Sequence, residues 1–537
     1  MLANTFKWSL LVVLFTLALL LSGCMVGPDF VKPDAEVEPG WMEKENPRIK
    51  SEPADFSDWW KVFNDPVLNG LIETAYQQNL NLQIAGLRIL EARAQLGVAV
   101  GLQYPQTQEV KGGATANQLS ENAANEAGSD RFFYDYQIGF DAAWELDFWG
   151  RFRRGVESSS ASLYATMANY DDILVSLTAE VARTYVVIRT FEKRLEVARE
   201  NVRLQKESLR LAELRFKEGV TTKLDVTQAR ALLKQTEALI PRLETSLRQA
   251  ENGLAILLGI LPAEVQPLLG GPRPIPIAPA QVAVGIPAEL LRRRPDIRLA
   301  EFQAAAQSAR IGVAKSDLYP RFSLVGSIGL QSSDKVGVQS NNANFSDLFS
   351  TDSITYFVGP TLQWSILNYG RLKNNVRVQD ARFQQLVVNY RNTVLKAAQE
   401  IEDAMVGFLR TQEETKLLAE SVENYKLSVD ISLIQYREGE ASYQRVVDTQ
   451  RFLTQEEDNL ASTTGSIAIN LIAMYKALGG GWELRLGKNF IPEKTRQEMR
   501  QRTDWGNLLP PEDLPKSIEG EPPTGQAIPV FSKPDLW

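Results

Sequence analysis

Two stretches of the chain decide its fold: residues 136–151 read YQIGFDAAWELDFWGR, and residues 356–371 read YFVGPTLQWSILNYGR. Tyrosine, glycine and tryptophan recur at matching places, and both stretches end in Gly-Arg, at a constant separation of 220 residues. Within each stretch, apolar and aromatic residues alternate with polar or small ones over about ten residues, which is the weak signature of a membrane β-barrel strand. A strand of a soluble β-sandwich alternates in the same way, so the alternation alone leaves both open.

The similarity extends over most of the chain. The other pairs separated by 220 residues are Phe216–Gly219 with Tyr436–Gly439 and Leu258–Gly259 with Leu478–Gly479. Tyr104-Pro105 and Tyr319-Pro320 are 215 residues apart, so the difference of five residues falls between Pro105 and Tyr136, in or near a loop. The chain is therefore an internal duplication, and both copies should contain the same order of elements.

Each copy predicts a helix, a strand, a polar loop, a second strand, and two long helices joined by a short turn. The leading helices are expected at about 66–101 and 287–317. The strands are expected at about 102–116 and 132–148 in the first copy, and at about 319–331 and 353–368 in the second.

The long helices carry an apolar residue at every seventh position. In the first copy these residues are Met167, Leu174, Val181, Ile188, Leu195, Val202, Leu209 and Phe216. In the second copy they are Val387, Val394, Ile401, Phe408, Thr415, Val422, Val429 and Tyr436, with one polar exception. A sustained seven-residue repeat predicts a left-handed coiled coil. A helix over 153–217 would be about 100 Å long at 1.5 Å per residue, far longer than a globular domain needs.

The number of strands predicts the assembly. Lipid does not tolerate an open sheet edge, and bacterial single-chain barrels begin at about 8 strands. Four strands per chain therefore need partners, and three chains give a 12-stranded barrel. The predicted fold class is mostly α with membrane β: an internally duplicated chain with four strands per protomer of a trimeric 12-stranded β-barrel, continuous with a long α-helical coiled-coil barrel.

The N-terminus has the pattern of a secreted lipoprotein. An apolar run from Leu10 to Leu21 is short for a bilayer span and predicts a signal peptide over 1–23. It ends in Leu-Ser-Gly-Cys, which resembles the bacterial lipoprotein processing box, and Cys24 is the only cysteine of the chain. We expect lipid on Cys24; the alternative is an ordinary signal peptide with an incidental cysteine. In lipoproteins an aspartate after the cysteine favours the inner membrane, so Met25 favours the outer membrane.

The composition argues against catalysis and against nucleic-acid binding. The 537 residues include no histidine and one cysteine, with a formal net charge of −8. The absence of histidine removes Ser-His, Cys-His and His-metal chemistry, and one cysteine forms neither an internal disulfide nor a cysteine-rich metal site. An acidic chain has no basic stripe for nucleic acid. We expect no enzyme, no catalytic site, no metal, and no cofactor except the covalent lipid on Cys24.

Several short motifs resemble the TolC-type outer-membrane efflux factors, in particular their OprM-like lipoprotein branch. The motifs are Cys24–Phe30 with Pro33, Trp59-Trp60 with Phe63, Asp65-Pro66 with Leu68, and the two Gly-Arg turns after the strands. Together they cover almost the whole chain with the duplication and the coiled coils.

The resemblance implies the organisation and the partners. It implies a homotrimer in the outer membrane, extending into the periplasm. Such a trimer receives drugs or other small toxic compounds from an inner-membrane pump of the RND type through a periplasmic membrane-fusion adaptor. The expected segments are a signal peptide (1–23), a lipidated segment (24–65), the first repeat (66–260), a Pro-rich linker (261–286), the second repeat (287–480) and an equatorial tail (481–537).

A conduit of this kind needs a gate, and the hairpin turns at Gly219 and Gly439 are its natural position. The resemblance implies an acidic ring from Asp448 and a bond from Tyr436 to Asp225 across the two copies. Alternatively, Asp448 is a solvated helix charge and Tyr436 only packs in the heptad seam.

Three further residues are expected near this ring. Arg451 matches a basic position of the OprM-like branch. Arg445 stands where some members have a second acidic residue, and Gln444 replaces an apolar one. Arg445 beside Asp448 would weaken cation selectivity or form ion pairs between subunits.

Two other functions fit parts of the pattern. A conduit for type I protein secretion has the same fold, although the lipid anchor fits drug efflux better. A poreless, lipid-anchored periplasmic adaptor or scaffold would have coiled coils, but not the duplicated amphipathic strands.

Overall fold

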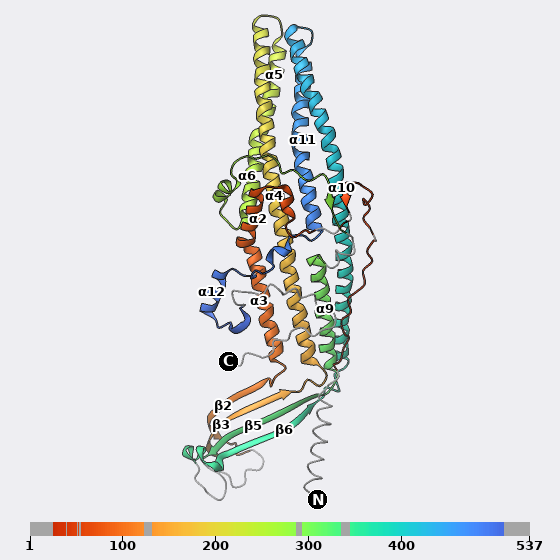
Figure 1. Cartoon of the computed structure of the whole chain (residues 1–537). Coiled ribbons are helices and arrows are strands. Elements are labelled where there is room, and N and C mark those ends of the chain that lie inside the picture. The colour runs from red at the N-terminus through yellow and green to blue at the C-terminus, as the bar shows by residue number, and fades with distance from the viewer. Residues whose placement is uncertain are drawn as a thin grey trace.

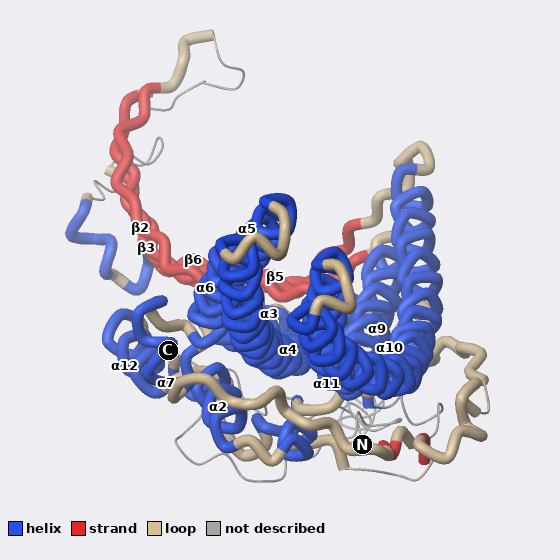
Figure 2. The backbone as a smooth tube through the Cα atoms, turned by 90° about the horizontal axis from the view of Figure 1, so that it is seen from above, coloured by secondary structure: helices blue, strands red, loops and turns tan. Residues whose placement is uncertain are grey.

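The molecule is elongated, with a β-sheet at one end and the tips of two helical hairpins at the other (Figure 1). The computed structural model describes residues 25–38, 40–50, 52, 55–122, 131–285, 293–334 and 344–509. The expected signal peptide at 1–23, Cys24 and the last part of the tail, 510–537, lie outside these residues. Seen along the long axis, the helices stand in a curved row (Figure 2).

Helices make up most of the described chain. In the first copy they are α2 (Pro66–Gln78), α3 (Leu80–Gly101), α4 (Arg151–Lys217), α5 (Lys223–Glu237) and α6 (Leu239–Leu258). The linker contains α7 (Val265–Leu269). The second copy has α9 (Pro295–Ser316), α10 (Arg371–Glu438) and α11 (Tyr443–Ala477), and α12 (Glu493–Arg502) follows.

The first-copy helix expected at 66–101 is wrong in one respect, because Asn79 divides it into α2 and α3. The Asn79 backbone is extended (ψ 122°), and its side chain accepts a hydrogen bond from Leu82 N at 2.9 Å as the N-cap of α3. Its amide also donates to Leu257 O (2.9 Å), which ties this break to α6. The long helix after the first turn is also divided, at Ala238, because Pro241 cannot donate the backbone bond that a continuous helix requires there.

The four expected strands form one antiparallel sheet in the order β2-β3-β5-β6. Their bounds are β2 (Thr107–Gln118), β3 (Phe132–Glu145), β5 (Arg321–Ser333) and β6 (Ile354–Gln363). The two copies join at the β3–β5 pair, in the centre of the sheet.

The predicted strand bounds were wrong at the helical end of the sheet. Residues 102–106 form the turn after α3, and residues 146–148 and 364–368 lie beyond the strands. The strand β5 is the shared neighbour of β3 and β6, and it begins only at Arg321. The apolar alternation therefore continues into segments that have almost no ladder partner.

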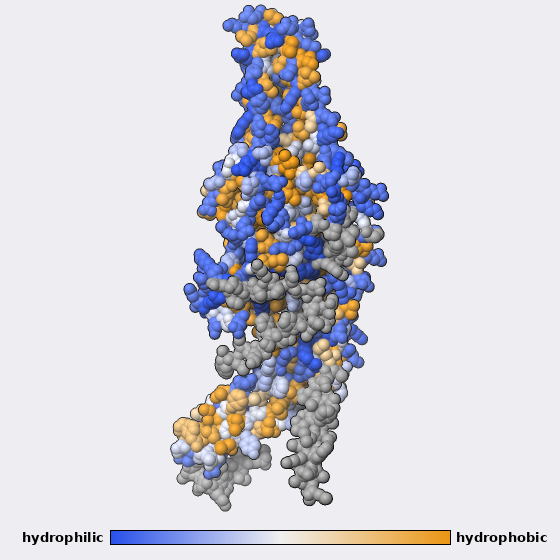
Figure 3. Space-filling view, in the orientation of Figure 1, coloured by the Kyte–Doolittle hydropathy of each residue, from blue (hydrophilic) through white to orange (hydrophobic). Residues whose placement is uncertain are grey.

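The register gives the sheet two different faces. One face exposes large apolar side chains: Tyr134, Ile138, Phe140 and Trp144 of β3, Leu324 and Ile328 of β5, and Tyr356, Val358 and Leu362 of β6. Hydrophobic residues gather over the sheet in Figure 3. The other face carries an ion cluster in which Lys111 Nζ lies 3.0 Å from Asp141 and 3.2 Å from Glu109. One face thus suits lipid and the other suits water.

The duplication is visible where the sheet meets the helices. Trp144 Nε1 donates to Gln103 O (3.2 Å), and Trp364 Nε1 donates to Leu318 O (3.1 Å). In both copies a tryptophan therefore ties the end of the second strand to the residues that follow the leading helix.

The long helices α4 and α10 contain 67 and 68 residues. The heptad positions Leu174, Val181, Ile188, Leu195 and Val202 are buried in α4, whereas Phe216 at the tip is 45% exposed. The seam thus loses its apolar cover near the hairpin turn.

The linker and the tail pack around the middle of the helices. In the linker, β4 (Val282–Ala283) pairs in parallel with β1 (Ile49–Lys50). In the tail, Arg485 forms an ion pair with Asp171, which is fully buried in α4, and Arg298 lies 3.6 Å from the same carboxylate. These contacts fix the returning chain to α4 and α9.

Among the described residues, no single helix has both the length and the apolar character of a membrane span; Lys223–Leu258 with Pro262–Leu269 meets the test only as a pair bent by 103°.

Candidate functional site

Both helical hairpins turn through a glycine in the left-handed conformation. Gly219 follows α4 with φ 74°, and Gly439 follows α10 with φ 85°. An L side chain is strained in this region, which explains a glycine at both turns. The amide after each glycine donates to the carbonyl five residues earlier, at 2.9 Å in the first copy and 2.8 Å in the second. The two tips share this backbone geometry, so their differences lie in the side chains.

Near the tips the hairpins meet through Tyr436 of α10 and Asp225 of α5. Tyr436 Oη donates to Asp225 Oδ2 at 3.3 Å, and Thr221 hydrogen-bonds to the same oxygen. Tyr436 is only 2% exposed, and its burial raises the pKa of its phenol, which therefore stays a protonated donor at neutral pH. The ring of Tyr436 thus packs in the seam while its hydroxyl bonds to the other copy.

The sequence reasoning missed a second tyrosine at this contact. Tyr443, the first residue of α11, lies 2.7 Å from Ser208 Oγ through its hydroxyl, and its ring centroid lies 4.9 Å from that of Tyr436. Burial raises the pKa of Tyr443 to about 12. The residue 220 positions earlier is Lys223, so this loss of the repeat was the available signal.

The sequence reasoning also missed Arg215 of α4. Its guanidinium lies 4.9 Å from the centroid of the Tyr436 ring. Arg215 also donates to Arg437 O, the carbonyl next to that tyrosine. One arginine of the first hairpin thus holds both the ring and the backbone of the second.

Asp448 lies one turn and a half into α11, among three polar partners. Its Oδ1 accepts from Gln444 Nε2 at 3.1 Å and from Arg451 Nη2 at 3.3 Å. Gln444 Oε1 accepts in turn from Gln228 Nε2 of α5 at 3.0 Å. Gln444 therefore connects the acidic position to the first hairpin.

Arg445 does not join this cluster. It is exposed, and within the described part of the chain it has no ion-pair partner. Arg451 is the arginine that neutralises Asp448, and both are partly exposed, so their pairing is weak.

A family model described as outer membrane efflux protein matches residues 71–260 and 286–480. The chain belongs to this family. Each matched stretch holds one copy of the repeat and one of the two hairpins.

Individual relatives agree with this assignment. The chain is 30% identical to the probable outer membrane lipoprotein SilC of Salmonella typhimurium, over 86% of this chain and 97% of that protein. It is 29% identical to the solvent efflux pump outer membrane protein SrpC of Pseudomonas putida, over 87% and 97%. The solved structure of the outer-membrane channel OprN superposes with a TM-score of 0.79 at 33% identity, over 86% of this chain and 100% of that one. The protein is thus an outer-membrane efflux component.

The N-terminal segment of this efflux protein starts beside the junction of sheet and helices. Val26 N donates to Trp149 O at 3.0 Å, just before α4. Arg154, 1% exposed, donates to Val26 O and to Asp29. Cys24 itself lies outside the described residues, two positions before the first of these contacts.

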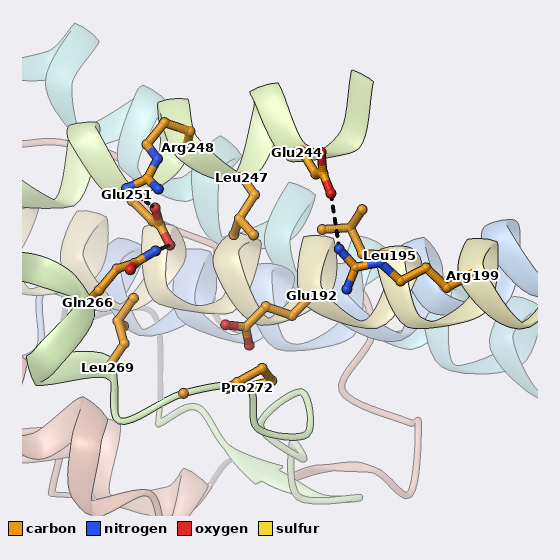
Figure 4. Close-up of a pocket in the computed structure, with 11 residues that line it drawn as sticks. Glu192, Leu195, Arg199, Glu244, Leu247, Arg248, Glu251, Gln266, Leu269 and Pro272 are labelled. Atoms are coloured by element: carbon orange, nitrogen blue, oxygen red, sulfur yellow. Dashed lines mark hydrogen bonds and ion pairs between the residues drawn. The ribbon is translucent and has the colours of Figure 1, made fainter. Parts of the chain in front are cut away.

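A pocket of about 650 Å³ lies far from the tips, between α4, α6 and the linker after α7 (Figure 4). Its charged side chains pair with each other: Arg199 with Glu244 at 3.0 Å, and Arg248 with Glu251 at 3.1 Å. Gln266 of α7 donates to Glu251 at 3.3 Å. The pocket therefore secures the linker on the hairpin and presents no unpaired charge to a substrate.

Proposed function

We propose that this efflux protein is the outer-membrane channel of a tripartite efflux system and acts as a homotrimer. The observation that carries the proposal is a four-stranded sheet with one exposed apolar face and two unpaired edges, β2 and β6. An unpaired edge costs several kcal/mol for each polar group in lipid. Pairing β6 of one protomer with β2 of the next, three times, removes all edges in a 12-stranded barrel.

The long helix α10 supports the same assembly. Val388, Leu395, Leu417 and Leu427 are between 55% and 66% exposed on it. A helix that crosses the periplasm does not leave such side chains in water, so α10 packs on a neighbouring protomer in a continuous α-helical barrel.

The transported compounds are drugs or other small toxic molecules, delivered by an RND-type pump through a periplasmic adaptor. The support is the family and the name of the relative SrpC, which is a component of a solvent efflux pump. The protein moves its cargo and does not transform it.

The periplasmic end of the channel is closed by the hairpin tips. Tyr436 and Asp225 join the two hairpins of each protomer, and Asp448 with Arg451 lines the aperture. The joined tips hold the closed state, and their release opens the channel.

Lipid on Cys24 anchors the trimer to the outer membrane. The supporting observation is the position of Met25 and Val26 beside Trp149, where the sheet meets the helices. The lipid would enter the membrane leaflet next to the sheet, so anchor and barrel reinforce each other.

The test is to cross-link the purified protein in detergent and to record planar-bilayer conductance from the same preparation. The expected result is a cross-linked trimer that conducts ions. A conducting monomer would exclude the shared barrel, and a non-conducting protein would favour a periplasmic scaffold.

A further inference from the structure

Each hairpin is held together internally by apolar side chains. Leu195, Ala198 and Leu243 form a buried cluster between α4 and α6 in the first hairpin. Val422, Val429 and Leu453 form the corresponding cluster between α10 and α11 in the second. Apolar contacts of this kind stay closed in water, so each hairpin should move as one unit.

The surface between the two hairpins, where α4 faces α11, is polar over the half nearest the tips. This polar seam consists of Arg194, Asn201, Gln205 and Ser208 of α4 and of Tyr443, Gln450, Thr454, Glu457 and Asp458 of α11. Arg194 forms two hydrogen bonds with Asp458, at 2.7 and 2.8 Å. Asn201 Nδ2 donates to Glu457 at 2.7 Å.

The middle of the polar seam has fewer bonds than its polar groups require. Thr454 Oγ1 donates to Asn201 Oδ1 at 2.9 Å and accepts from Gln205 Nε2 at 3.3 Å. Gln450 is 3% exposed, and neither atom of its side-chain amide has a hydrogen-bond partner within the described chain. The same holds for Gln205 Oε1. Buried amides of this kind bind ordered water, so the seam has room for hydration at these two glutamines.

Toward the middle of the molecule the interface between α4 and α11 becomes apolar. Val186 of α4 and Ala468, Leu471 and Ile472 of α11 are buried in the main hydrophobic core. The change occurs at Gly465, where an added Cβ would lie 2.1 Å from the Thr190 hydroxyl. The two helices thus touch most closely at the border between the two kinds of interface.

We infer that the channel opens by separation of the two hairpins along the polar seam, with the Thr190–Gly465 contact as the hinge and water entering at Gln205 and Gln450. The inference rests on the proposed function, because it states how the proposed gate moves. Polar pairs exchange protein partners for water at small net cost, whereas the apolar interface beyond the hinge does not. The weak interface therefore parts, and the strong one stays closed.

Hydrogen–deuterium exchange of the full-length protein in detergent tests the hinge. Backbone amides of 195–212 and 446–462 should exchange about tenfold or more faster than those of 177–189 and 466–474, with the change at Thr190 and Gly465. Uniform exchange along α4 and α11 would overturn the inference.

A pair of leucine variants tests the role of water. Gln205→Leu with Gln450→Leu fills the seam with apolar groups and should slow exchange below the hinge about tenfold while lowering the fraction of time that the channel conducts. Gln455→Leu, at an exposed position of the same helix, is the control and should change neither. Unchanged exchange in the double variant would contradict the inference. If the wild-type protein does not conduct at all, the proposed function fails instead, whatever the exchange pattern.

Discussion

The contact between the hairpin tips makes a quantitative prediction for the double variant Tyr436→Phe with Asp448→Ala. Tyr436→Phe removes the hydrogen bond to Asp225 and leaves the ring in place. A bond to a charged group contributes about 1.5–3 kcal/mol. At 3.3 Å, with Thr221 still bonded to Asp225, we expect about 1 kcal/mol.

Asp448→Ala acts less directly. Within one chain Asp448 bonds only to residues of α11, and it reaches the first hairpin through Gln444 and Gln228. Releasing Gln444 should cost about 0.5 kcal/mol. The sum, about 1.5 kcal/mol, favours the open state about tenfold in each protomer, and about a thousandfold if three protomers open together.

Planar-bilayer conductance and the uptake of a bulky antibiotic by cells measure this shift. Both should rise in the double variant at normal trimer yield. Tyr425→Phe, on the same helix and partly buried against Phe452, is the matched control and should behave as the wild type. If conductance in the double variant equals that of the wild type, the tip residues are surface charges and packing, and the gate assignment is refuted.

Three further predictions concern the anchor, the middle of the helices and the turn. Cys24→Ser should abolish the incorporation of labelled fatty acid, since no other cysteine is available; undiminished labelling would exclude the anchor. Burial and the nearby carboxylates of Asp296 and Glu400 raise the pKa of Asp172 to about 6, so the folded state binds its proton more tightly than the unfolded state, and stability from this group falls as the pH rises through 6. Asp172→Asn should therefore raise the temperature of trimer dissociation more at pH 8 than at pH 4, by at most about 2–3 kcal/mol in stability, whereas the exposed Asp430→Asn should not; an equal effect at both pH values would refute the shift. Gly439→Ala should destabilise the hairpin turn by about 1–2 kcal/mol through its positive φ, measurable as faster proteolysis at the tip, with the helical Gly97→Ala as the control; equal cleavage of both variants would contradict it.

The sequence was sufficient for the parts of the fold that follow from periodicity. The 220-residue repeat predicted four strands and two long hairpins, and the structure contains them. It was insufficient at the ends of elements, because an alternating pattern does not record where a neighbouring strand begins. Asn79 divided a helix that read as continuous, since its role as a cap depends on Leu82 and on the distant Leu257.

The candidate gate was predictable only through the family. The resemblance pointed to Tyr436 with Asp225, and the structure brings these two residues together. It gave no reason to choose Tyr443 or Arg215, whose contacts need the distance between two hairpins. Arg445 and Arg451 are equally spaced from Asp448 in sequence, and only the helix geometry separates the paired arginine from the free one.

The duplication also explains why opening would use one interface and not another. Residues 220 positions from the polar seam are not equivalent in chemistry: Tyr425 stands for Gln205, and Lys223 and Arg230 stand for Tyr443 and Gln450. The second copy thus lacks the small neutral amides and hydroxyls that can be buried and still bind water. A protomer with two similar hairpins therefore has a single hydrated seam, between α4 and α11. In a trimer the three seams recur around the axis, and movement at each one changes the aperture without disturbing the apolar core that holds every hairpin together.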